Sequence, residues 1–297
     1  MAVNIVRAIV NGQTVTLTYN STSGKYEATI TAPGTSSYNI NSGHYYPVTV
    51  KATDEAGNVT TKDDTDSVLG ASLQLKVKEK TAPVITIISP TAGAYIVSNK
   101  PTIKWKITDD DSGVKTSSLK ITVDSTVITD GITTTAISGG YECTYTPSAA
   151  LSDGSHTIKL DATDNDGNAA SQKSVTFKID TVPPMLSVSK PAAVLITNNK
   201  TCTVSGTTND AISSPVTVKI NGQSVMVKDD GSFSTSVTLS EGDNTITVVS
   251  TDSAGKSTTV TRKVTLDTAA PTIKNITLTP NPVDAGQTYI ISVEVTD

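Results

Sequence analysis

The chain has 297 residues, enough for about two to four domains, with a net charge of −5 and only 4% aromatic residues. Its 23 basic residues are scattered, and the missing basic stripe with stacking aromatics argues against a nucleic-acid partner. No apolar run approaches the roughly 18 residues that cross a bilayer, so we also expect no membrane partner.

Ser, Thr, Val and Ile dominate the chain, and no stretch shows helix periodicity with caps, which predicts an all-β protein. The first residues, MAVNIVRAIVNGQTV, lack a basic segment followed by an apolar core, so we expect no Sec signal. Cys143 and Cys202 lie among alternating apolar positions of different repeats. We therefore expect buried free thiols, as in proteins that assemble in a reducing cytoplasm.

In chain order, the first expected elements are a hairpin that turns at Asn11-Gly12 and a strand over residues 24–33. An alternating run over residues 46–54 follows, then a turn with Gly57 and a further strand within residues 72–80. Gly suits this turn because it accepts positive φ without a steric cost. These elements predict a second hairpin.

The same pattern occurs three times. The Thr-Asp pairs Thr53-Asp54, Thr163-Asp164 and Thr251-Asp252 each follow an alternating run and precede a Gly-containing turn and another strand. The stretches DEAGN, DNDGN and DSAGK are therefore interpreted mainly as one hairpin turn in three domains.

Pro-marked segments over residues 80–90, 180–191 and 267–280 begin new repeats with almost no linker. The middle repeat opens with two strands, the second of which alternates Ile103, Trp105 and Ile107 with lysines; Trp105 should anchor its core. In the third repeat Cys202 and Val204 should point inward. The predicted domains are residues 1–80, 81–181, 182–268 and a two-strand piece, 269–297.

The motifs ATDEAGN, ATDNDGN and STDSAGK, with VNGQ and GKYEATI, resemble bacterial Ig-like (Big) repeats over essentially the whole chain. The resemblance implies tandem Ig-like β-sandwich domains in a row, each of about seven strands in two packed sheets. Such repeats occur in surface adhesins, carbohydrate-active enzymes and bacteriophage virion proteins. They are specific for the fold and carry little information on function.

The first repeat lacks the two opening strands, whereas residues 269–297 carry only those two strands. One hypothesis is that the C-terminal strands of one subunit complete the first domain of the next, a head-to-tail contact that builds rings or filaments. The alternatives are a cut within a longer array, a smaller first sandwich, or capping by strands of another protein. The residues expected at the donated interface are Ile276, Leu278, Ile291, Val293 and Val295.

Two groups of polar residues are candidate sites. The first is a calcium site in the middle repeat, because Ca²⁺ prefers several carboxylate oxygens, although the full spacing of a calcium loop is missing. Its candidate residues are Asp109, Asp110, Asp111, Asp164 and Asp166. The second is the segment 36–47, where Tyr38, His44, Tyr45 and Tyr46 could stack on sugar rings or dock a protein; a loop that covers the end of the first domain is the alternative. No other cofactor is expected.

No nucleophile elbow, paired-carboxylate cleft or phosphate loop is present, which predicts a protein that is not an enzyme. The favoured interpretation is an accessory virion protein of a bacteriophage, on its tail or capsid, assembled in the bacterial cytoplasm. Its expected partners are other virion subunits, in a homo-oligomer or a head-to-tail contact, and a host-surface glycan. The alternatives are a fragment of a secreted adhesin or cell-wall protein at the bacterial surface, and a carbohydrate-binding spacer of a larger enzyme.

Overall fold

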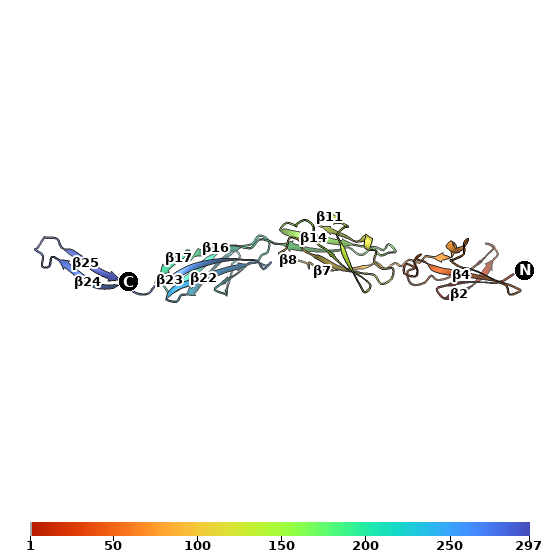
Figure 1. Ribbon diagram of the computed structural model, residues 1–297, viewed down its shortest axis with the longest axis horizontal. Helices are drawn as coiled ribbons and strands as arrows, with labels where there is room; N and C mark the ends of the chain where they lie inside the picture. Colours follow the sequence, from red (N-terminus) through yellow and green to blue (C-terminus); the bar gives the residue numbers. More distant parts are fainter. Residues whose placement is uncertain (1) are drawn as a thin grey trace. The chain divides into compact units, whose positions relative to one another are not determined.

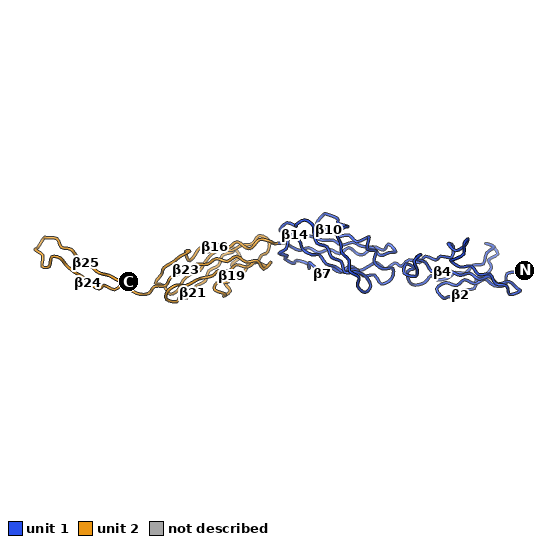
Figure 2. The backbone as a smooth tube through the Cα atoms, in the orientation of Figure 1, with its two compact units in different colours: residues 1–179 blue, residues 180–297 orange. Residues whose placement is uncertain are grey.

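The computed structural model describes residues 2–297, which form β-strands and two short 3₁₀ turns and contain no α-helix (Figure 1). The all-β prediction is confirmed. The chain divides into two compact units, residues 1–179 and 180–297 (Figure 2). The boundaries that we predicted for individual domains inside these units stay a prediction.

Unit 1 begins with a single sheet in the order β3-β2-β1-β4-β5, in which β6 also pairs with β4. The Asn11-Gly12 turn between β1 and β2 has positive φ at both residues, as a two-residue hairpin loop requires. The strands of this first sheet are β1 (Val3–Val10), β2 (Gln13–Asn20), β3 (Lys25–Glu27), β4 (Tyr46–Asp54), β5 (Val59–Lys62) and β6 (Gln74–Leu75).

Two predicted strands of this region are much shorter than expected. The strand predicted over residues 24–33 is only the three residues of β3, and the run 72–80 gives only the two residues of β6. The strand that follows the Gly57 turn is β5 instead. In the later repeats the strand equivalent to β3 pairs with an opening strand, and the first sheet has no such strand to pair with among residues 2–80.

The second part of unit 1 is a sandwich of two sheets, ordered β11-β10-β14-β15-β8 and β12-β13-β9-β7. Period-two alternation turns every second side chain of a strand into the space between the sheets. The strands are β7 (Val84–Ser89), β8 (Tyr95–Ile96), β9 (Ile103–Thr108), β10 (Lys120–Val123), β11 (Thr126–Ile128), β12 (Thr133–Ile137), β13 (Gly140–Tyr145), β14 (Gly154–Asp161) and β15 (Lys173–Ile179).

The core of this sandwich confirms the alternation seen in the sequence. Ile103, Trp105 and Ile107 of β9 are fully buried, and Trp105 retains only 1% of its exposure. Cys143 of β13 lies directly opposite Trp105 in the sheet register and is buried as a free thiol. Phe177 of β15 adds the second large aromatic ring of the same cluster.

Unit 2 contains a sandwich of the sheets β16-β18-β21 and β17-β23-β22-β19-β20. Cys202 and Val204 of β18 point into its core as predicted, together with Val248 and Val264. The strands are β16 (Met185–Lys190), β17 (Val194–Thr197), β18 (Thr201–Asn209), β19 (Thr217–Ile220), β20 (Gln223–Val225), β21 (Ser232–Thr238), β22 (Gly242–Thr251) and β23 (Ser257–Leu266).

The rest of unit 2 is a hairpin of β24 (Thr272–Thr279) and β25 (Ile290–Thr296), in which every residue is exposed. In the register, Thr272 pairs with Thr296 as Val84 of β7 pairs with Thr108 of β9. The hairpin is thus the equivalent of the two strands that open each complete sandwich. A lone two-stranded hairpin is at best marginally stable in water.

Candidate functional site

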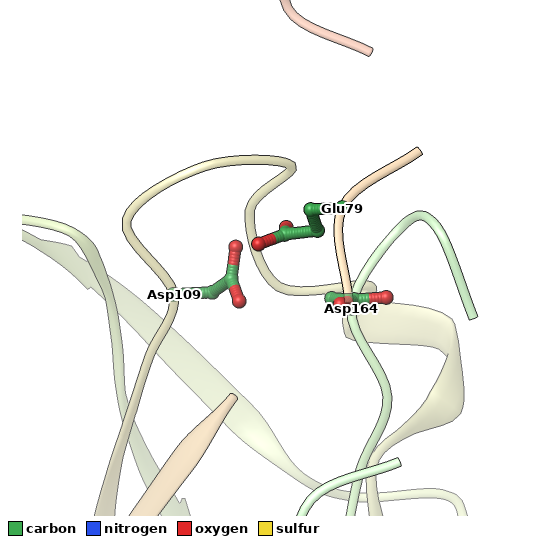
Figure 3. Close-up of side chains that lie close together, drawn as sticks. All are labelled: Glu79, Asp109 and Asp164. Atoms are coloured by element: carbon green, nitrogen blue, oxygen red, sulfur yellow. The ribbon is translucent and has the colours of Figure 1, made fainter. Parts of the chain in front are cut away.

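Three carboxyl groups meet near the start of the second sandwich of unit 1. Glu79 comes from the segment after β6, Asp109 directly follows β9, and Asp164 follows β14 (Figure 3). Each residue offers a carboxylate oxygen, and the three oxygens lie within 4.8 Å of one another. Asp109 and Asp164 are buried and Glu79 is half-buried, so this is a desolvated acidic cluster rather than a charged surface. We call it the unit 1 cluster.

Backbone groups hold the unit 1 cluster in place. Asp109 accepts the N–H of Gly113 at 2.7 Å, and Asp164 accepts the N–H groups of Gly167 and Asn168 at 2.6 and 2.8 Å. Glu79 accepts the N–H of Ser112 at 2.7 Å. Burial, reinforced by the negative charges of Asp109 and Asp111, raises the pKa of Glu79 despite that hydrogen bond.

Unit 2 has a second acidic cluster of the same construction. Asp180 follows Ile179 in the chain, Asp210 follows β18, and Asp252 follows β22; their carboxylate oxygens also lie within 4.8 Å of one another. Asp180 is 1% exposed and Asp252 is 6% exposed. The Ser213 hydroxyl, fully buried, donates to the carboxylate of Asp180. We call this the unit 2 cluster.

The two clusters occupy equivalent positions of two repeats. The interval from Glu79 to Asp109 equals the interval from Asp180 to Asp210. Asp164 and Asp252 are the aspartates of equivalent Thr-Asp pairs, and both accept the N–H group four residues later. Repetition of the whole set shows that the arrangement belongs to the repeat and is not an accident of one loop.

The structure brings together only two of the five acidic residues that the sequence singled out, Asp109 and Asp164. Asp110 is exposed. Both carboxylate oxygens of Asp111 accept the N–H of Ser36, and Asp166 accepts the N–H of Glu79 at 3.0 Å. Asp111 and Asp166 therefore connect the first sheet's loop and the following segment to the second sandwich. Metal binding by Asp110, Asp111 and Asp166 stays an untested prediction.

Sequence reasoning missed four members of these clusters, which are Glu79, Asp180, Asp210 and Asp252. The sequence did contain a signal for them. An acidic residue just before each complete sandwich and an acidic residue after its second opening strand are separated by the same number of residues in both repeats. Such residues look like solvated strand ends when each is considered alone. Only the sandwich topology shows that three strand ends meet.

The tyrosine-rich segment is folded against its own sheet. Tyr46 is 2% exposed and its hydroxyl lies 2.6 Å from the hydroxyl of Thr35, and Tyr45 donates to Asp64 at 2.9 Å. The rings of Tyr38 and His44 stack with centroids 4.0 Å apart. Tyr46 therefore belongs to the packed interior, whereas His44 is exposed and Tyr38 is half-buried. The binding role of the segment stays a prediction.

The five residues predicted at a donated-strand interface are neighbours in the terminal hairpin. Ile276 pairs with Val293 and Leu278 pairs with Ile291, so these side chains share one face of the hairpin. Measured back from the acid that follows the strand, Val295, Val293 and Ile291 match the buried Ile107, Trp105 and Ile103 of β9. The same positions that build a core in unit 1 are exposed here.

Two family models match the chain. Residues 83–160 match a bacterial Ig domain, and residues 184–268 match domain B of glucodextranase. The two matches fall on the two complete sandwiches. The two complete sandwiches are thus similar to Ig-like domains, in agreement with the resemblance seen in the motifs.

Among curated proteins, bacillopeptidase F of Bacillus subtilis (strain 168) is 29% identical over 133 residues, which cover 45% of this chain and 9% of that protein. Among solved structures, fibronectin(III)-like modules of Clostridium thermocellum CbhA are 18% identical, with a TM-score of 0.39 and coverage of 62% of this chain and 94% of theirs. A structure from a 1.5-MDa bacterial ice-binding adhesin is 21% identical, with a TM-score of 0.33 and coverage of 90% and 87%. At these identities the likeness concerns the fold alone.

The described residues contain no helix that is long and apolar enough to span a membrane.

Proposed function

We propose that this protein is a non-catalytic structural module, built of Ig-like repeats, that presents or spaces binding surfaces at a cell or particle surface. The observation that carries the proposal is the repetition of one sandwich, each copy opened by a Pro-marked strand and each with the same three acidic strand ends. Repeats of one sandwich suit spacing and display better than catalysis.

The setting that we favour is a bacteriophage virion, where the module would decorate the tail or capsid and contact the host surface. Two buried free cysteines support assembly in a reducing compartment. Burial raises the pKa of the Cys143 thiol to about 11, which keeps it protonated and unreactive. The competing setting is the bacterial cell surface, which the adhesin-like repeats suit equally well.

Detection of the protein in intact particles would separate these settings. An antibody raised against the chain should label purified phage particles in electron micrographs, and the protein should co-sediment with infectivity in a density gradient. Antibody labelling of intact bacterial cells in a culture free of phage would contradict the virion setting and support the cell-surface module. Labelling of neither would refute both settings.

We further propose that the terminal hairpin docks on the first sheet of a second copy. The first sheet carries the rows Leu17–Val6–Ala52 and Val15–Ala8–Val50 across β2, β1 and β4, in which Val6 and Ala8 are buried and the four outer residues are half-buried. It is the one sheet of unit 1 that lacks a facing sheet in the described chain. The hairpin is equivalent to the opening strands of the later sandwiches, for which the first sheet has no counterpart among the described residues, and this is why a second copy is the favoured occupant.

Light scattering with paired variants tests this docking. Val293→Asp places a charge on the apolar face of β25 and should convert higher-order species to monomers. Ser292→Asp places the same charge on the opposite face of the same strand and should leave association unchanged. A wild-type chain that is monomeric at all accessible concentrations, or equal effects of the two variants, would show that the hairpin does not join subunits.

A further inference from the structure

We propose that Asp180, Asp210 and Asp252 bind one Ca²⁺ ion, and that Glu79, Asp109 and Asp164 form the equivalent site of unit 1. The ion would hold together the three chain segments that carry these carboxylates, at the end where each complete sandwich begins. The inference goes beyond the display role and does not depend on whether the setting is a virion or a cell surface.

The carboxylates of both clusters have no positively charged side chain as a partner. Three carboxylates converge within 4.8 Å in each cluster, and none of the six forms an ion pair with Lys, Arg or His in the described chain. Buried carboxylates that face one another repel strongly, and burial of an unpaired charge is costly. A bound divalent cation attracts all three carboxylates and offsets two of their three charges.

One carboxylate oxygen of Asp252 is buried and has no hydrogen-bond donor. In the unit 2 cluster, Asp252 Oδ1 accepts the N–H of Lys256 at 2.8 Å, but Oδ2 is buried without any hydrogen-bond partner. In the unit 1 cluster the equivalent oxygen of Asp164 accepts the side-chain amide of Asn168 at 2.6 Å. Lys256 takes the position that Asn168 has in the unit 1 cluster, and a lysine has no side-chain amide. The second oxygen of Asp252 therefore has no donor in the protein. A buried acceptor of this kind is the expected ligand of a cation.

The size and chemistry of the site favour calcium. Ca²⁺ binds oxygen ligands at about 2.3–2.6 Å, so two ligands of one ion lie at most about 5 Å apart, and the oxygens of each cluster, all within 4.8 Å of one another, meet this condition. Mg²⁺ requires shorter distances of about 2.1 Å in a rigid octahedron. The clusters offer no nitrogen or sulfur ligand, which makes them poor Zn²⁺ sites. Water can supply the remaining ligands, since Ca²⁺ accepts about six to eight.

The ligands are also pre-positioned. Asp210 accepts the N–H groups of Ile212 and Ser213 at 2.8 and 2.7 Å, which fixes its carboxylate before any ion arrives. The unit 1 cluster adjoins a solvent-open hollow lined by Thr35, Glu79 and Asp109, which gives an ion a way in. We expect the unit 2 site to bind more tightly, because it has three aspartates and one oxygen that no donor satisfies.

Calorimetric titration of the chelator-treated full-length chain with CaCl₂ measures the binding directly. We expect two sites for Ca²⁺ and much weaker binding of Mg²⁺. Asp252→Asn should weaken the tighter site at least tenfold, and Asp180→Asn should do the same from a different loop. Asp230→Asn is the matched control, because Asp230 also accepts a backbone N–H in a turn of unit 2 but is exposed and belongs to neither cluster. Absence of binding, or equal binding by Asp252→Asn and wild type, would overturn the proposal.

Thermal unfolding with and without calcium distinguishes a metal ligand from an aspartate that only stabilises the fold. In chelator, Asp252→Asn removes one of three repelling charges and should unfold at the same temperature as wild type or higher. In excess CaCl₂ the order should reverse, since only wild type gains the binding energy of its folded state. If Asp252→Asn is less stable than wild type by the same margin in both conditions, the aspartate is structural and the calcium site is wrong.

Discussion

Trp105 is the largest fully buried side chain of the described protein, and its position follows from simple alternation along β9. Replacement by Ala would leave a large cavity between two sheets and remove many contacts. We expect Trp105→Ala to lower the free energy of unfolding of the second sandwich by about 3–5 kcal/mol. Denaturant unfolding measures this loss, and Tyr19→Ala, at an exposed aromatic, should cost much less.

His156 makes the same sandwich sensitive to pH. Burial disfavours the protonated ring, but the Asp124 carboxylate 2.9 Å from Nδ1 and the Ser152 carbonyl 2.7 Å from Nε2 outweigh it and raise the pKa above 6.5. Both nitrogens face acceptors, so the doubly protonated ring fits best.

A raised pKa means that the folded state binds the proton more tightly than the unfolded state. The stabilisation is complete below pH 6.5 and is lost as the pH rises through the folded-state pKa. We therefore expect the unfolding temperature of this sandwich to fall as the pH rises above 6.5, and the fall to disappear in His156→Gln. An NMR titration of the His156 ring that gives a pKa below 6.5 would contradict this.

The burial of a residue could be predicted where it follows from the alternation along a single strand. It could not be predicted where several chain segments come together. The inward positions of Trp105, Cys202 and Val204 follow from period-two alternation, which a sequence displays directly. Glu79 and Asp180 end strands or segments and look like ordinary solvated acids. Their burial arises because the sandwich brings three chain segments together, and the sequence alone does not display that proximity.

At the scale of elements, Gly206 shows why particular strands tolerate only Gly. A Cβ atom at Gly206 of β18 would lie 2.1 Å from the Ser187 carbonyl oxygen of β16 and 2.7 Å from the Phe233 ring of β21. We expect Gly206→Ala to destabilise the unit 2 sandwich by about 1–3 kcal/mol through forced displacement of β16. Gly34→Ala is the control in thermal unfolding, because a Cβ there meets no atom within 4 Å.

The elements that were predicted poorly all lie in the first sheet. Residues 24–33 and 72–80 carry the alternation of strands, yet only β3 and β6 form within them. A strand needs a neighbour for its backbone groups, and β13 and β21, the equivalents of β3, each pair with an opening strand. Residues 24–33 have no such neighbour in the described chain, so pattern alone overestimates this strand. Within residues 72–80, β6 pairs only with Tyr46 and Pro47, because β5 occupies the rest of that edge of β4.

At the scale of unit 1, the first sheet is connected to the second sandwich by a few defined contacts. The buried N–H of Ser36 donates to both oxygens of Asp111, and Lys78 donates to the Asp166 carbonyl. Asp111→Ala would leave that N–H without its partner, at a cost of about 1–3 kcal/mol. We expect faster amide exchange at Ser36 and easier proteolysis of residues 33–45 in Asp111→Ala, and no change in the exposed neighbour variant Asp110→Ala.

The terminal hairpin has a consequence for the whole assembly. Asp267 and Asp297 are separated by the same interval as Asp180 and Asp210, so the hairpin carries two of the three acids of a cluster. The third would be the aspartate of a Thr-Asp turn, which Asp54 supplies on the first sheet. Docking of the hairpin on another copy would then create one more ion site at the seam. Under both proposals, chelation would remove the ion from each complete sandwich and from the seam, so one ligand would act both on the stability of single domains and on the association of subunits.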